Sequence, residues 1–331
     1  MISDISTLFD AEESAEFQSP LSILTVDGGA LLFDGGAHQF VKMSDDWTRL
    51  FTFGEEGRGP GEFQQVNRVW ENEEGFLIYD RPNAKFVQFD RQGRWIDDRT
   101  FDHSSFNLDF LLSPASIGLI EPNLLAISTD GYNGSLAVLL DSISGSTTYL
   151  GEASGDYVTS IAHDRPKMIR DVQSGIIPGH LQNSVILKSN QSGLFLYQTT
   201  TAILEKYSHS GELLWTENVL FPFQEDLMDH MFAVNSDRLN RGLFMSHNYL
   251  FNYVVSMTTT EEGVAFQLNL TDENAVAVAW ISNDGEDISI VHYEGMEHRP
   301  TQIAVQSDVK DPYILFLNLF EGQIYRAAWP L

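Results

Sequence analysis

The feature that most constrains this chain is a strand–turn–strand frame that recurs with fixed spacing. The step from Asp34 to Phe40 is six residues, and the same step separates Asp80 from Phe86 and Gln198 from Leu204. A turn glycine follows Asp80, Gln198 and Asp272 at an offset of thirteen residues, as Gly93, Gly211 and Gly285. The segments between these points are short, alternate with period two and are rich in β-branched and aromatic residues, which is typical of strands. The chain is therefore predicted to be all-β.

Six units of this kind fit along the sequence. They are expected at about 19–54, 63–102, 110–154, 184–221, 249–295 and 299–331, within one domain spanning 1–331. Each unit has room for four strands except the last, which has room for three, and residues 2–9 supply a short, mostly apolar segment that can complete it. The repeat period of 40–50 residues predicts a six-bladed β-propeller closed by the N-terminal strand, since closure removes open sheet edges. A β-sandwich pair is the alternative fold.

One of these units resembles a known repeat. Gly57-Arg58-Gly59-Pro60-Gly61-Glu62-Phe63 precedes the strand Gly75–Asp80, and Asn83, the strand Lys85–Asp90 and Gly93 follow in order. This pattern is similar to the NHL-type repeat of bacterial six-bladed β-propeller proteins, clearly so over 54–102 and more loosely over 19–54 and 184–221. The resemblance implies a propeller fold. It also implies an exported or periplasmic protein if a signal segment has been removed, and a cytoplasmic one otherwise.

Composition excludes several classes of function. The 331 residues carry 47 acidic and 19 basic side chains, a formal net charge of -28, which disfavours nucleic acid because such binding relies on Lys and Arg. The absence of cysteine excludes disulfides, thiolate metal sites and cysteine nucleophiles. No apolar run reaches the roughly 18–20 residues of a membrane span, and no export signal is visible at the start. A soluble acidic surface or a saline habitat both fit the charge.

Uneven spacing between the units locates two insertions, at about 155–183 and 222–248. Long connections on a regular scaffold are where function tends to lie. The first insertion concentrates positive charge in an acidic chain, and we expect its polar side chains to contact a ligand, for example an anionic group. These candidate ligand-binding residues are His163, Asp164, Arg165, Arg170 and His180. Neutralisation of neighbouring carboxylates is the alternative role.

The second insertion predicts one short helix over 223–232. Asp226 and His230 are four residues apart and would share a helix face, a spacing compatible with metal ligands, with His163 or Asp164 as further ligands. The alternative is a helical lid whose Met228, Met231 and Phe232 pack on the propeller. No cofactor is expected; calcium is the alternative, because hard oxygen ligands would favour it.

The sequence therefore favours a non-catalytic binding or scaffold propeller, monomeric, that recognises a protein, peptide or glycan at the face carrying the insertions. No catalytic motif such as Gly-x-Ser-x-Gly is present. The alternative is a divalent-metal-dependent hydrolase or lactonase with its site in the central channel, since a fold alone does not fix a function.

Overall fold

The computed structural model describes residues 2, 4–10, 17–101, 117–121, 123–154, 165–246, 250–272 and 275–330. The chain divides into two compact units, which are described separately below. Unit 1 comprises Met1–Leu108, Asn274–Val278 and Val291–Leu331, and unit 2 comprises Asp109–Glu273 and Ala279–Ile290. None of the helices in the described part of the chain has the length and apolar character needed to cross a membrane.

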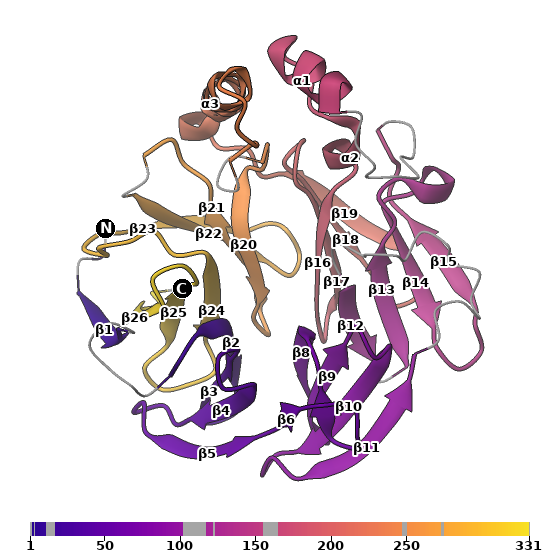
Figure 1. The fold of residues 1–331 in the computed structure, drawn as a ribbon, viewed down its shortest axis with the longest axis vertical. Coiled ribbons are helices and arrows are strands. Elements are labelled where there is room, and N and C mark those ends of the chain that lie inside the picture. The colour runs from indigo at the N-terminus through magenta and orange to yellow at the C-terminus, as the bar shows by residue number, and fades with distance from the viewer. Residues whose placement is uncertain are drawn as a thin grey trace. The chain divides into compact units, whose positions relative to one another are not determined.

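Six four-stranded sheets make up the fold, and their strands follow one another in chain order (Figure 1). The first sheet consists of β2 (Pro20–Val26), β3 (Gly29–Asp34), β4 (Gln39–Met43) and β5 (Arg49–Phe53). The second sheet consists of β8 (Val66–Asn72), β9 (Gly75–Asp80), β10 (Lys85–Asp90) and β11 (Trp95–Thr100). Sheets three and four are β12 (Ile117–Glu121), β13 (Leu124–Ser128), β14 (Ala137–Asp141), β15 (Thr147–Leu150), and β16 (Val185–Asn190), β17 (Gly193–Gln198), β18 (Ile203–Tyr207), β19 (Leu213–Asn218). Sheet five is β20 (Val254–Thr259), β21 (Gly263–Leu268), β22 (Val276–Ser282) and β23 (Ile288–Tyr293).

The sixth sheet joins the two ends of the chain. It holds β24 (Gln302–Gln306), β25 (Tyr313–Asn318), β26 (Gln323–Ala328) and, as its fourth strand, β1 (Ile5–Phe9). β1 runs antiparallel to β26, with Ile5 opposite Ala327 and Phe9 opposite Ile324, and Figure 1 shows the indigo strand beside the yellow one. The prediction that the N-terminal segment completes the last blade is confirmed.

The first hairpin of a blade depends on a glycine. Gly193 opens β17 with a φ of +146°, a conformation that side chains with a Cβ rarely adopt, and an added Cβ would lie 2.3 Å from the carbonyl oxygen of Tyr207. Gly75 opens β9 in the same way, with a φ of +140° and the carbonyl oxygen of Phe89 at 2.3 Å. The third strand therefore passes so close to the start of the second that only glycine fits there.

The aspartates that end the second strands tie each blade to the chain that enters it. The carboxylate of Asp34 accepts hydrogen bonds from the backbone N–H groups of Gln18 and Ser19, both at 2.8 Å. The carboxylate of Asp80 likewise accepts from the N–H groups of Gln64 and Gln65, at 3.0 and 3.1 Å. The sequence predicts only a turn cap at these residues. Asp34 does accept from the N–H of Gly36 within its turn, at 3.1 Å, but its longer-range bonds also fix where the first strand begins.

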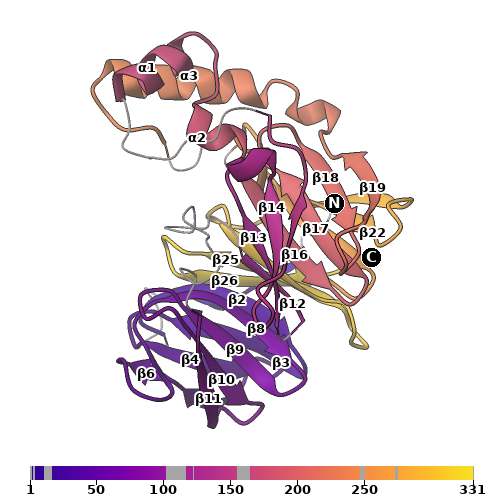
Figure 2. The ribbon, with the colours of Figure 1, turned by 90° about the vertical axis from the view of Figure 1, so that its right-hand side faces the viewer.

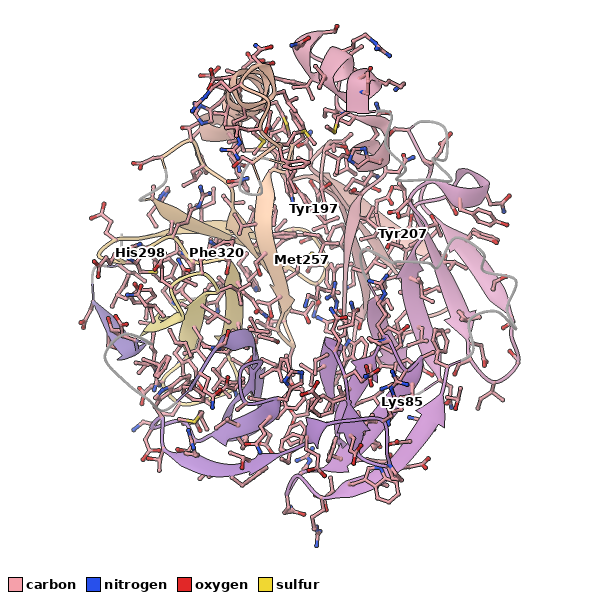
Figure 3. The ribbon with its side chains drawn as sticks, viewed as in Figure 1. Lys85, Tyr197, Tyr207, Met257, His298 and Phe320 are labelled. Atoms are coloured by element: carbon pink, nitrogen blue, oxygen red, sulfur yellow. The ribbon has the colours of Figure 1, made fainter. Side chains whose placement is uncertain are left out.

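The glycine–proline–glycine loop of unit 1 is held by buried polar contacts. It contains β6 (Glu55–Glu56) and β7 (Glu62–Phe63), which pair in parallel. Lys85, labelled in Figure 3, donates from Nζ to the carbonyl oxygen of Gly59 at 2.8 Å and to Oδ2 of Asp98 at 2.7 Å. The ring of Phe63 is fully buried in the core cluster that contains Phe40. The loop therefore acts as a structural clamp on this part of unit 1.

In unit 2, the long connections before and after the fourth sheet form helices. They are α1 (Arg165–Gln173), α2 (Gly179–Gln182) and α3 (Leu227–Asn240), with short 3-10 turns at Tyr132–Gly134 and Pro222–Gln224. Figure 2 shows α1 and α3 beyond the ends of the strands of unit 2. We call residues 165–182 and 222–246 the helical cap.

Candidate functional site

The core of the helical cap is a single stripe on α3. Leu227, Met231, Asn235 and Leu239 follow one another at intervals of four residues, which places them on one helix face, and all four are buried. This stripe explains why the helix extends to Asn240, beyond the predicted 223–232. Of the methionines predicted to pack as a lid, Met231 is fully buried, while Met228 is only half-buried. The half-buried ring of Phe232 packs on Phe251 with centroids 4.6 Å apart.

α1 and α3 pack against each other and end close together. They lie side by side in Figure 2, and they are in contact. At their carboxyl ends, Nε2 of Gln173, the last residue of α1, donates to Oδ1 of Asn240, the last residue of α3, at 2.6 Å. The residues that follow the two helices therefore emerge from neighbouring points on the surface of unit 2.

Both helices stop in the same way, with a Schellman turn. After α1, the N–H of Gly175 donates to the carbonyl of Val172 at 3.1 Å and that of Ile176 to Asp171 at 2.8 Å. After α3, the N–H of Gly242 donates to Leu239 at 3.0 Å and that of Leu243 to Arg238 at 2.9 Å. Gly175 and Gly242 have φ values of +70° and +75°, the left-handed conformation that this motif requires.

The turns leave apolar side chains exposed to solvent. The residue after the glycine usually makes an apolar contact with the third or fourth residue from the helix end. Here the third residues are the charged Asp171 and Arg238, and Ile176 and Leu243 are 50% and 40% exposed. The next residue along, Phe244, is 74% exposed. We call Ile176, Leu243 and Phe244 the apolar tip.

The backbone of the tip is fixed by hydrogen bonds on both sides of Phe244. Nε of Arg238 donates to the carbonyl oxygen of Phe244 at 2.9 Å. The N–H of Ser246 donates to Oδ1 of Asn235, the fully buried amide within the α3 stripe, at 2.9 Å. Phe244 is thus presented on an ordered turn, so little backbone entropy would be lost if a partner covered it.

The base of the cap is bonded to the sheets of unit 2. The side chain of Gln224, which is buried, donates from Nε2 to the carbonyl oxygens of Tyr253 at 2.9 Å and of Asn269 at 2.7 Å. The N–H of Tyr253 donates to the carbonyl of Thr199 at 3.2 Å. Burial raises the pKa of Tyr253, and the charge of Asp229 on α3 raises it further. Burial also holds the pKa of Tyr197, labelled in Figure 3, well above its usual value.

A second loop of unit 2 packs beside α2. Asn183, just after α2, accepts from the N–H of Ser154 at 2.9 Å through Oδ1 and donates to the carbonyl of Asp130 at 3.4 Å. Asp130 has a φ of +53°, and its Oδ1 is buried without a hydrogen-bond partner in the described part of the chain. Burial raises the pKa of this carboxyl group above its ordinary value.

The raised pKa of Asp130 predicts that ionisation of this carboxyl group lowers the stability of the folded protein in a pH-dependent way. Because the folded state holds the Asp130 proton more tightly than the unfolded chain does, the free energy of unfolding falls as pH rises through the window above the unfolded pKa of about 3.9. Asp130→Asn removes the ionisation and keeps a residue that tolerates a positive φ. Urea denaturation should therefore show a more stable variant at pH 7, with the gain vanishing below about pH 4.

Asp141→Asn is the matched control in the same sheet. Backbone hydrogen bonds from Ser144 and Ile143 hold the pKa of Asp141 below its usual value, so this variant should lose stability at pH 7. If Asp130→Asn and Asp141→Asn both raised the free energy of unfolding at pH 7, the effect at Asp130 would not come from removing its ionisation.

The predicted ligand-binding residues lie partly on the cap. Arg165 is the first residue of α1, but its side chain, like all of His163 and Asp164, lies outside the described residues. Arg170 is exposed in the last turn of α1, where a cation complements the helix dipole. His180 is half-buried in α2. Ligand contact at these residues stays a prediction.

The predicted metal pair lies at the start of α3. Asp226 is exposed at the N-cap position, and its carbonyl oxygen accepts the N–H of the half-buried His230 at 3.0 Å, which gives the predicted helical spacing. Two side chains alone do not make a metal site, and the structurally described residues contain no group of three or more His, Cys, Asp or Glu that could hold a metal ion. Metal binding at Asp226 and His230 stays a prediction.

The apolar tip was not among the predicted site residues. The available signal was the pair of glycines, Gly175 and Gly242, each followed by an apolar residue after a helix-compatible stretch. Reading it required knowing that both helices form and that the apolar residues after them stay exposed.

No family model matches the chain, and no curated protein matches it in sequence. Solved structures do resemble it. A member of the DUF4221 family from Bacteroides vulgatus is 10% identical with a TM-score of 0.61, over 99% of this chain and 96% of that one. An exported protein from Bacteroides fragilis, described as putative, is 10% identical with a TM-score of 0.58, over 98% and 94%. A catalytically inactive virginiamycin B lyase from Staphylococcus aureus, bound to quinupristin, is 11% identical with a TM-score of 0.50, over 99% and 86%. Likeness at these identities identifies the fold, and that fold is a six-bladed β-propeller.

Proposed function

We propose that this protein is a non-catalytic binding propeller of the NHL-like kind, and that it recognises a protein or peptide ligand through its helical cap. The observation that carries the proposal is the apolar tip. Ile176, Leu243 and Phe244 are exposed together, on turns fixed by backbone hydrogen bonds, at the adjoining ends of two packed helices. Ordered, exposed apolar side chains grouped in this way are a mark of interaction surfaces.

The chemistry of the tip favours a protein or peptide over a glycan. Aliphatic and phenyl side chains offer no hydrogen-bonding group to a sugar hydroxyl, whereas they match the apolar anchors that proteins bury at the centre of an interface. The cap as a whole carries no net formal charge. Residues 165–182 and 222–246 hold five basic and five acidic side chains, so the whole net charge of -28 lies elsewhere in the chain.

Site-specific photo-crosslinking tests this function. A photoreactive phenylalanine analogue at position 244 is expected to give a discrete cross-linked product in the cells that make the protein. The same analogue at Ile143, which is 77% exposed on a turn of the third sheet outside the cap, is the matched control. Equal labelling at both positions, or no product at position 244, would contradict the proposal.

A further inference from the structure

We infer that the partner of the helical cap is a cationic amphipathic protein segment, whose apolar side chains cover the apolar tip while its Lys and Arg residues face acidic side chains of this chain. This inference rests on the proposed function, because it names the class of partner for the same surface. Its support comes from how charge and apolar area are distributed over the molecule.

The tip supplies the apolar half of the recognition. Phe244 projects most, at 74% exposure, and Ile176 and Leu243 flank it on the adjoining turns. Burying the three side chains would remove a compact apolar patch from water, which favours association in proportion to the apolar area removed. The preformed backbone lowers the entropic cost of that burial.

Three cations of the cap are held by contacts within the cap. Nζ of Lys167 pairs with Asp171 at 2.8 Å, and Nη1 of Arg241 pairs with Asp237 at 3.3 Å. Nε of Arg238 is bound to the Phe244 carbonyl at 2.9 Å.

Three exposed carboxylates remain at the other end of α3. Glu225, Asp226 and Asp229 lie at or just before the first turn of that helix, and none of them forms an ion pair with another described residue. A helix of 14 residues is about 21 Å long. A partner helix running along α3 from the tip would therefore reach these carboxylates with side chains about four helical turns from its apolar anchors.

The net negative charge of the rest of the chain favours a partner that carries positive charge. Outside the cap there are 42 acidic and 14 basic residues, so the long-range field is strongly negative. Such a field speeds the approach of a cationic partner and opposes an anionic one. It also opposes a second copy of this chain, which would bring another -28 charges, and an anionic membrane surface.

The probe for this inference is a fluorescein-labelled peptide of about 16 residues built from Leu and Lys at helical spacing, with matched peptides in which Glu or Gln replaces every Lys. Binding to the full chain is measured by fluorescence anisotropy at 0.15 M and 0.5 M salt. We expect the Lys peptide to bind, the Glu peptide not to bind and the Gln peptide to bind at least tenfold more weakly. Affinity should fall at high salt, because exposed charges are then screened.

Variants separate docking on the cap from unspecific attraction to an acidic protein. The double variant Ile176→Ser/Phe244→Ser keeps the net charge and is expected to bind the Lys peptide at least tenfold more weakly than the parent chain does. The single variant Ile143→Ser should bind the Lys peptide with unchanged affinity. Thermal melts of both variants that match the parent chain confirm that the fold is kept. Equal weakening by both variants, or by neither, would overturn the inference.

Two other possible occupants of the apolar tip, a second copy of this chain and a lipid surface, are tested as well. Sedimentation velocity without peptide detects self-association, and flotation with zwitterionic phosphatidylcholine vesicles detects lipid binding. Either activity, if lost in the double variant, would overturn the inference in favour of that occupant. Cross-links from position 244 to a neutral or acidic protein would contradict the inference of a cationic partner but would leave the proposed function intact. If position 244 gave no more cross-linked product than the control at position 143, both the inference and the proposed function would be contradicted.

Discussion

Deleting residues 1–10 is expected to lower the free energy of unfolding by at least about 5 kcal/mol, enough to unfold a typical domain of marginal stability. The deletion removes β1, which pairs with β26 from Ile5 to Phe9, and leaves that edge of β26 unpaired. It also removes the ring of Phe9, which is buried in the core cluster that holds Ile324 and Leu317. Loss of a buried phenyl ring alone costs about 3–5 kcal/mol. Urea denaturation followed by tryptophan fluorescence measures the change.

Point variants in β1 show how much of this loss of stability comes from the Phe9 side chain. Phe9→Ala should account for about 3–5 kcal/mol, whereas Thr7→Ala, at an exposed position of the same strand, should change stability by no more than about 0.5 kcal/mol. A synthetic peptide of residues 1–10 should restore the truncated chain in part, since an edge strand can be supplied in trans. An unchanged denaturation midpoint after truncation would show that β1 does not hold the sixth sheet together.

Lys85→Met is expected to cost about 3–5 kcal/mol, because it breaks a largely buried ion pair and leaves one charge behind. Lys85 and Asp98 meet at 2.7 Å with side chains only 10% and 22% exposed. Asp98 also accepts the N–H of Gly61 at 3.2 Å and the indole N–H of Trp95 at 2.9 Å through Oδ1, so the pair secures the glycine-rich loop as well as the strands. Chemical denaturation of each variant gives the free-energy change.

A double-mutant cycle distinguishes a specific pair from general damage. Lys85→Met/Asp98→Leu should be more stable than Lys85→Met, because no uncompensated charge remains. The pair of the exposed Arg94 with Asp90 is the control in the same sheet, and Arg94→Ala should cost no more than about 1 kcal/mol because that cation stays in solvent. Equal costs at Lys85 and Arg94 would contradict the assignment of the loop as a clamp.

The strands and their order were predictable because the signals for them are local. Alternation of apolar and polar residues sets the two faces of a strand, and glycines such as Gly75 and Gly193 mark hairpins whose backbone no other residue fits. The fixed spacing then counts the blades. The partner of β1 could also be inferred, because one unit lacked a strand and one short apolar segment was left over.

Contacts between residues distant in the sequence were harder to foresee. Local sequence indicates only a turn cap at Asp80, yet its carboxylate binds the backbone of Gln64 and Gln65, sixteen and fifteen residues earlier. The α3 helix extends past the predicted end because Asn235, a polar residue, belongs to the buried stripe and is satisfied there by the N–H of Ser246. Residue type alone predicts a surface position for such an amide.

The sequence alone indicated an all-β chain of six four-stranded units and its closure by the N-terminal strand, because turn chemistry and side-chain alternation act between near neighbours. Which side chains of the helical cap stand exposed depends on the tertiary structure. Ile176 and Phe244 stand 68 positions apart in the sequence, and they share a surface because α1 packs on α3 and both helices end at the same place. Exposure is a property of the packed molecule: an apolar residue is buried or free according to what the rest of the chain places over it.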